Sequence, residues 1–107
     1  DPACNPYLAF SVLLAAGLDG VEKEYEVPPP VVENLYEMSS EERVRRGIRS
    51  LPGSLWEAIQ CVEHSEVVRD ALGEHVFHSF IQNKKIEWEN YRSQVTDYEL
   101  KRYLAIL

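Results

Sequence analysis

The first apolar stretch of the chain has no polar face. Residues 7–18 read YLAFSVLLAAGL, and ten of the twelve are apolar. Asn5 and Pro6 precede them as a helix N-cap and a first helical residue, where the missing proline N–H costs nothing. The pattern predicts a helix to about Leu18, ended by Gly20 in the left-handed conformation. A helix that is apolar all round is expected to be buried on every side, and the rest of this short chain offers little to cover it.

A long connection is predicted from Val21 to Met38. Glu22, Glu24 and Glu26 alternate with other residues, which allows a short edge strand with the acids as a solvated face. The three prolines at 28–30 then exclude helix and favour polyproline II.

Capping signals divide the remainder of the chain into helices. S/T-x-x-E boxes, in which the cap and the Glu satisfy each other's backbone N–H groups, begin at Ser39, Ser54 and Thr96. Ser65 is a further N-cap, and glycines end two of the segments. We expect helices over about 39–47, 54–63, 65–73, 74–93 and 96–104.

The longest of these helices, 74–93, has a stripe with the 3.6-residue period of a half-buried helix. The chain contains no internal repeat and no low-complexity run. We therefore predict one all-α segment, residues 1–107, with about five to six helices and a long Pro-rich loop. The stripe comprises Phe77, Phe80, Ile81, the stem of Lys84, Trp88 and Tyr91.

Composition narrows the class of protein. The chain has 11 Lys and Arg against 18 Asp and Glu, a net charge of −7, which argues against a nucleic-acid partner. The first apolar stretch is too short for a membrane span, and no basic residue precedes it as in a signal peptide. Cys4 and Cys61 form no disulfide framework, so a reducing cytoplasm is the default. The start at Asp1 indicates processing or a piece of a longer protein.

One metal-like pattern competes with a plain alternative. Cys61, His64, His75 and His78 read C-x2-H-x10-H-x2-H, which zinc could bind. The alternative, surface or core histidines, is favoured because zinc-binding signatures place two cysteines in the first pair. Cys61 is interpreted as a small packed residue on a helix, and a Cys–His nucleophile pair stays open.

No other pattern carries chemistry. The five glycines form no phosphate loop, and there is no Gly-x-Ser-x-Gly elbow. Most of the carboxylates that stand out are explained by capping or by a solvated face. By motifs alone, the segment contains no complete active site.

Several longer motifs, in order and at matching spacing, make the whole chain resemble type I glutamine synthetases just after their last active-site strand. The resemblance implies that the chain is the C-terminal helical part of a larger α+β catalytic domain. Its motifs also look closest to the archaeal and Gram-positive branch, which is not adenylylated. The motifs are DPACNPYLAF at 1–10, AAGLDG at 15–20, NLY at 34–36, ALGEH at 71–75 and EWENYRSQV at 87–95.

The resemblance also implies an activity. The family makes glutamine from glutamate and ammonia: ATP phosphorylates the glutamate side chain, and ammonia displaces the phosphate, with Mg²⁺ or Mn²⁺ neutralising the phosphoryl group. The matching motifs place that machinery upstream, so no catalytic, cofactor-binding or metal residue is carried over. We expect the isolated segment to be inactive. The alternative is a free-standing helical interaction module without catalysis, which a start codon directly before Asp1 would favour.

In the family, this segment would contribute to assembly and regulation. The resemblance implies a cytoplasmic homo-oligomer of two stacked six-membered rings. Nitrogen-regulatory proteins are possible partners of this oligomer. The first helix would pack on the back of the active-site sheet. The last helix would reach a subunit of the opposite ring, the alternative being a tail folded on its own core. The inter-subunit candidates are Tyr98, Tyr103, Leu104, Ile106 and Leu107.

Two positions are regulatory candidates by resemblance. Tyr36 matches the tyrosine that one branch of the family adenylylates, whereas the other motifs match the other branch and favour an unmodified loop tyrosine. Glu87 lies where that other branch couples feedback between subunits. Its alternative role is a solvated acid on a helix.

Overall fold

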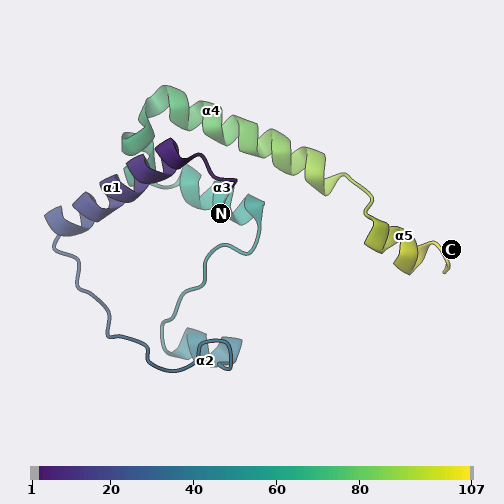
Figure 1. Ribbon diagram of the computed structural model, residues 1–107, viewed down its shortest axis with the longest axis horizontal. Helices are drawn as coiled ribbons and strands as arrows, with labels where there is room; N and C mark the ends of the chain where they lie inside the picture. Colours follow the sequence, from purple (N-terminus) through teal and green to yellow (C-terminus); the bar gives the residue numbers. More distant parts are fainter. Residues whose placement is uncertain (1–2, 107) are drawn as a thin grey trace.

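The chain is helical throughout the part that the computed structural model describes, residues 3–106 (Figure 1). No strand occurs among these residues, so the all-α prediction is confirmed. No helix within them is long and apolar enough to cross a membrane. The helices are α1 (Pro6–Glu22), α2 (Ser40–Arg45), α3 (Leu55–Glu63), α4 (Glu66–Arg92) and α5 (Asp97–Tyr103).

The core lies between α3 and α4. Ile59 of α3 and Phe77 and Ile81 of α4 are its buried side chains among the described residues. The stripe predicted from helical period therefore supplies two of the three. The ring of Trp88 stacks on that of Trp56, with centroids 6.5 Å apart, and extends the contact along α4. Partly buried residues around this core are Leu55, Val62, Val68, Leu72 and Trp88.

α4 bends at Gly73, where the sequence predicts one helix to end and the next to begin. Gly73 has φ 72° and ψ 155°, outside any helical conformation. Only glycine adopts this backbone region readily, because it has no Cβ. The bend turns the first part of α4 away from the direction of its long straight part (Figure 1). The described residues form five helices if α4 is counted once and six if it is counted as two. Both numbers agree with the predicted five to six helices.

The predicted end of α1 is wrong. The helix continues through Gly20 to Glu22, and the left-handed residue is Glu24, with φ 51°. Two hydrogen bonds close the end: Tyr25 N–H donates to Gly20 O (3.1 Å) and Glu24 N–H to Val21 O (3.3 Å). This is a Schellman motif formed around a glutamate instead of a glycine.

Side-chain contacts explain the extension of α1. Tyr25 folds back on the helix, and its hydroxyl donates to Asp19 Oδ2 across 3.0 Å. Lys23 Nζ lies 2.7 Å from the same carboxylate. These contacts hold the chain in a compact turn at residues 23–25. The short edge strand that the sequence allowed over 21–27 does not form, since helix and turn occupy its start.

The three predicted capping boxes form to different extents. Thr96 and Glu99 make both reciprocal bonds, so this box is complete. Ser39 and Ser54 each accept the N–H of the residue three positions on, which confirms them as N-caps. Their boxes stay half-formed because the two glutamates bond elsewhere: Glu42 to Arg45 and Arg46, and Glu57 to the Gly53 N–H.

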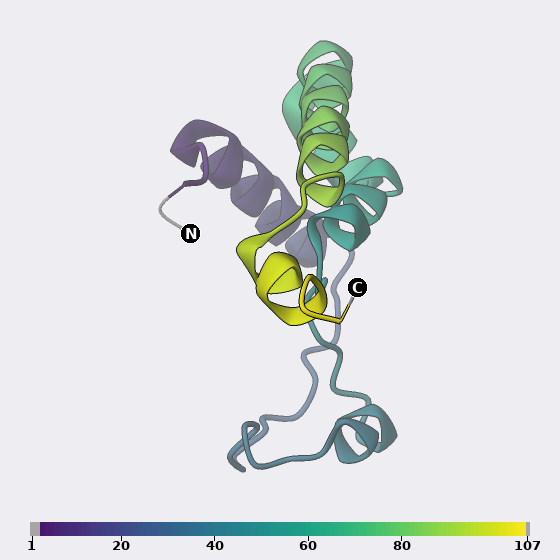
Figure 2. The same ribbon diagram turned by 90° about the vertical axis from the view of Figure 1, so that its right-hand side faces the viewer.

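The helices of the described residues pack in only two pairs, α1 on α4 and α3 on α4. Residues 24–53, here called the α2 excursion, carry α2 away from this body, and α5 projects from the far end of α4 (Figure 1). A second view shows the excursion equally clear of the other helices (Figure 2). The architecture is a three-helix body with two projecting elements.

Candidate functional site

α1 is covered on one side only. Its half-buried residues include Leu8, Val12 and Ala15, which share the face toward α4. No residue of α1 is buried, whereas an apolar helix was expected to be enclosed. The reason is that the described chain places only α4 against it. The uncovered face consists of Tyr7, Phe10, Leu14, Leu18 and Val21, which are 54–82 % exposed.

The apolar residues near the chain end are also uncovered. Tyr98, Tyr103, Leu104 and Ile106 are all more than half exposed. α5 packs on no other helix of the described chain, so the alternative of a tail folded on its own core is not realised there. Leu107, the fifth inter-subunit candidate, lies outside the described residues.

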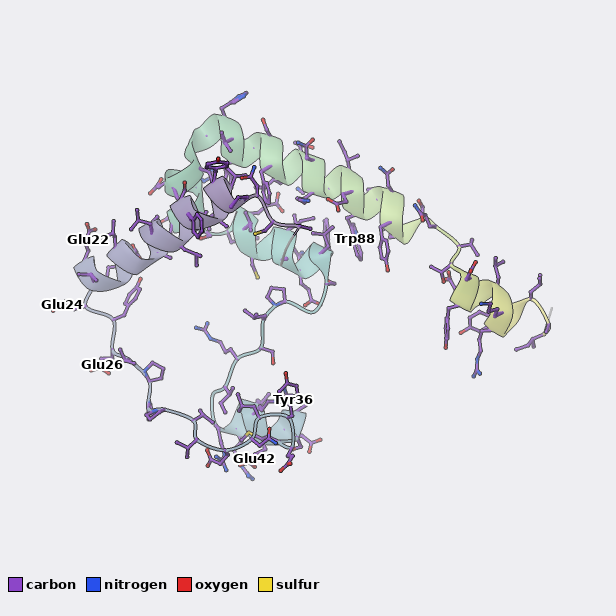
Figure 3. The ribbon with its side chains drawn as sticks, in the orientation of Figure 1. Glu22, Glu24, Glu26, Tyr36, Glu42 and Trp88 are labelled. Atoms are coloured by element: carbon purple, nitrogen blue, oxygen red, sulfur yellow. The ribbon has the colours of Figure 1, made fainter. Side chains whose placement is uncertain are left out.

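The two regulatory candidates are far apart and both exposed. Tyr36 is fully exposed in the α2 excursion (Figure 3). Its N–H donates to Asn34 Oδ1 across 3.1 Å, so a side-chain turn presents the ring. Glu87 lies on α4, with its carboxylate 2.6 Å from Lys84 Nζ. Nothing in the described chain buries either residue.

The zinc-like pattern is not brought together. Among residues 3–106, no three His, Cys, Asp or Glu side chains converge on a point that could hold a metal ion. His78 Nε2 lies 2.9 Å from Glu74, and His64 Nδ1 lies 2.7 Å from the Gln60 carbonyl. Among the described residues, the four side chains of the pattern therefore do not form one site.

Cys61 is exposed, so its interpretation as a packed residue is wrong. Ile59 takes the core position of α3, and two residues further on a helix lie about 200° around the axis. Cys61 instead lines an open hollow beside His64, together with Leu51 and Pro52. The sequence placed it beside apolar neighbours but could not show which of them faced α4.

The described residues contain no converging set of three metal ligands, and the sequence contains no glycine-rich phosphate loop. Most ion pairs of the described residues join side chains three or four positions apart, and a few join more distant residues. One that sequence reasoning missed joins Arg46 Nη1 to Glu33 Oε1 across 2.7 Å. The hydrogen bond from Arg46 lowers the pKa of Glu33 below its usual value.

Known proteins resemble the chain along its whole length. The family model described as glutamine synthetase, catalytic domain, matches residues 1–103. A glutamine synthetase of Mycolicibacterium smegmatis is 58 % identical over 106 residues, and one of Thermus thermophilus is 50 % identical over 105. A glutamine synthetase of Methanococcus maripaludis is 49 % identical over 106.

These alignments cover 98–99 % of the chain but 24 % of each relative. The chain thus spans about a quarter of the length of the curated relatives that it matches. Extended identity at this level, together with a family model matching nearly all residues, leaves one conclusion. The chain belongs to the glutamine synthetase family and corresponds to the C-terminal part of the type I catalytic domain.

Proposed function

We propose that the chain is the helical C-terminal part of a glutamine synthetase and serves there as scaffold and subunit contact. The observation that carries this proposal is the uncovered apolar face of α1, defined above by Tyr7, Phe10, Leu14, Leu18 and Val21. A free-standing domain rarely exposes such a continuous patch. The chain spans about a quarter of the length of its relatives. In a protein of that length, the other three quarters could cover this face of α1.

The proposed reaction of the full-length protein joins ammonia to glutamate. ATP would transfer its γ-phosphoryl group to the glutamate side chain to give γ-glutamyl phosphate and ADP, and ammonia would displace the phosphate. Mg²⁺ or Mn²⁺ would neutralise the transferring group. By resemblance, the residues for these steps lie upstream of this segment, which would position the catalytic sheet through α1 instead of touching substrate.

The projecting α5 supports a role between subunits. We propose that it inserts into a subunit of the opposite ring in an assembly of two stacked six-membered rings. The exposed side chains of Tyr98, Tyr103, Leu104 and Ile106 would supply the apolar contact, and Leu107 would extend it. The complete capping box at Thr96 fixes where this helix begins, so α5 would dock as a formed element.

Of the two regulatory candidates, Glu87 is the proposed site of control in the cytoplasm, and Tyr36 is proposed to stay an unmodified loop tyrosine. The Tyr36 side chain is exposed, so mass spectrometry of the protein purified from its source would detect an added nucleotide if a modifying enzyme acted there. Glu87 would couple feedback between subunits, and Glu87→Gln should then weaken inhibition by glutamine without lowering uninhibited activity. Unchanged inhibition would leave Glu87 as a solvated acid. Nitrogen-regulatory proteins are the proposed partners.

The activity is tested by comparing two samples. The full-length protein should release ADP from ATP only when both glutamate and ammonia are present, and the purified 107-residue chain should release none. Activity of the 107-residue chain above background would overturn the scaffold role. Inactivity of the folded full-length protein would favour the interaction module without catalysis.

The subunit contact is tested by charge insertion in the full-length protein. Leu104→Asp should separate the stacked rings, because it places a charge in an apolar contact, and light scattering should report half the mass. Lys101→Gln on the same helix is the matched control and should leave the mass unchanged. An undisturbed double ring in Leu104→Asp would refute the proposed role of α5.

A further inference from the structure

One part of the α2 excursion, residues 39–50, is basic although the chain as a whole is acidic. Residues 39–50 contain four arginines and two glutamates, against a net charge of −7 for the whole chain. Because α2 packs on no other helix of the described chain, most of these guanidinium groups remain accessible to solvent. Neither the scaffold role nor the proposed reaction uses them.

The four arginines divide into two functionally different pairs. Arg45 and Arg46 are both ion-paired with Glu42, and Arg46 reaches Glu33 as well. Among residues 3–106, no carboxylate lies within ion-pair distance of Arg43 or Arg49. Arg43 instead donates from Nη2 to the hydroxyl of Ser40 at 3.4 Å. Within the part of the chain that the structure describes, these two positive charges therefore have no counter-charge nearby.

The end of α2 brings these two free arginines to the same hollow. Gly47, with φ 71°, reverses the chain, and Ile48 N–H donates to Arg43 O across 2.9 Å. A second bond, from Gly47 N–H to Val44 O at 3.0 Å, completes a Schellman motif. This fixed turn returns the chain past the helix.

The resulting hollow has a volume of about 490 Å³ and carries hydroxyl donors beside the two arginines. Ser40 lies on its wall at the start of α2, and Ser50 lies on the returning chain. The described residues that line it include no acidic side chain. The polar side chains that line it are Arg43, Arg49, Ser40 and Ser50.

We propose that this hollow binds a phosphate group, either as the free ion or as a phosphate monoester. Guanidinium groups recognise phosphate oxygens through paired, charge-assisted hydrogen bonds, and the hydroxyls of Ser40 and Ser50 add neutral donors. A bound dianion would supply the counter-charge that Arg43 and Arg49 lack.

The experiment counts phosphate sites on the full-length protein by equilibrium dialysis with radiolabelled inorganic phosphate. The wild type should bind one more phosphate per subunit than the variant Arg43→Gln/Arg49→Gln, in which affinity at this site should fall at least tenfold. The matched control, Arg45→Gln/Arg92→Gln, removes the same charge from ion-paired residues outside the hollow and should keep the wild-type count. Circular dichroism of each variant checks that it is folded.

The outcomes are decisive in both directions. Equal phosphate counts in the wild type and the Arg43→Gln/Arg49→Gln variant would overturn the proposal. A loss of similar size in the control would also overturn it, because it would show a nonspecific charge effect. If the site is confirmed, competition by phenyl phosphate at concentrations below those needed for inorganic phosphate would identify a monoester as its ligand, and the reverse order would identify the free ion.

Discussion

Lys85 Nζ lies 2.5 Å from Glu63 Oε1 and joins α4 to the end of α3 across 22 residues of sequence. Both side chains are about two-thirds removed from solvent, at 35 % and 30 % exposure. The pair therefore links the two helices that supply the core residues Ile59, Phe77 and Ile81. Lys85 is not part of the apolar stripe predicted from the sequence, and no sequence pattern indicated its ion-pair partner.

We expect this ion pair to contribute modestly to local stability. Lys85→Met and Glu63→Gln should show a coupling free energy of about 0.5–1 kcal/mol in a double-mutant cycle, because the pair is only partly shielded from water. Hydrogen exchange of α3 amides in the full-length protein measures it. The exposed pair Glu89–Arg92, treated in the same way, should couple more weakly. Equal coupling in the two pairs would show that partial burial contributes nothing.

Replacing Glu24 by glycine should stabilise the end of α1. Glu24 has φ 51°, and a non-glycine residue in the left-handed region costs about 1 kcal/mol relative to glycine. Amide exchange in the last turn of α1 should therefore slow about threefold to fivefold. Glu22→Gly is the control: residue 22 is helical, so the same change should cost about 1 kcal/mol. Faster exchange in both variants would refute the assigned backbone.

Replacing Gly73 by alanine adds only one methyl group but should strongly destabilise the start of α4. The backbone at φ 72° and ψ 155° is accessible to glycine almost alone, and forcing another residue into it costs about 1–3 kcal/mol. Exchange of the first turns of α4 should accelerate by one to two orders of magnitude. Ser79→Ala, within the regular part of α4, should change exchange by less than threefold. If Gly73→Ala behaved like Ser79→Ala, α4 would be straight.

The capping box of α5 should make its helicity depend on pH. Hydrogen bonds from the Thr96 N–H and hydroxyl lower the pKa of Glu99 from its usual 4.5. A depressed pKa means that the folded form binds the proton less well. The stabilisation is therefore present above pH 4.5 and is lost as pH falls through the folded pKa.

Circular dichroism of a peptide covering residues 94–106 tests this dependence. The wild-type signal at 222 nm should weaken below about pH 4.5 relative to Glu99→Gln, which keeps a neutral acceptor at all pH values. Thr96→Ala should be less helical than both at pH 7, since an N-cap contributes about 1 kcal/mol. Parallel pH curves for the wild-type and Gln peptides would show that Glu99 does not cap.

Helix starts were largely predictable because their signals are local. Asn5, Ser39, Ser54, Ser65 and Thr96 all act as N-caps in the structure, each through its own side-chain oxygen. An N-cap bonds to N–H groups two or three residues away, so the surrounding sequence contains the whole interaction. Helix ends were predictable where glycine reverses the chain, as at Gly47 and Gly73.

The end of α1 shows where local signals fail. Gly20 had the residue type of a helix end, but the fold-back of Tyr25 on Asp19 keeps it helical and moves the reversal to Glu24. The residue that reverses the chain instead is Glu24, and a glutamate is disfavoured in the left-handed region. Side-chain contacts after the helix outweighed that preference.

The sequence by itself determined the helical class, the helix starts, the two α4 residues of the core and membership of the glutamine synthetase family. Tertiary structure decided which side of α1 is covered, that Cys61 faces outward, that Lys85 meets Glu63, and that Arg43 and Arg49 share a hollow. Caps and helical period depend on residues within about one turn of each other. Burial and pairing depend on which distant segments meet, and that is settled only when the helices pack.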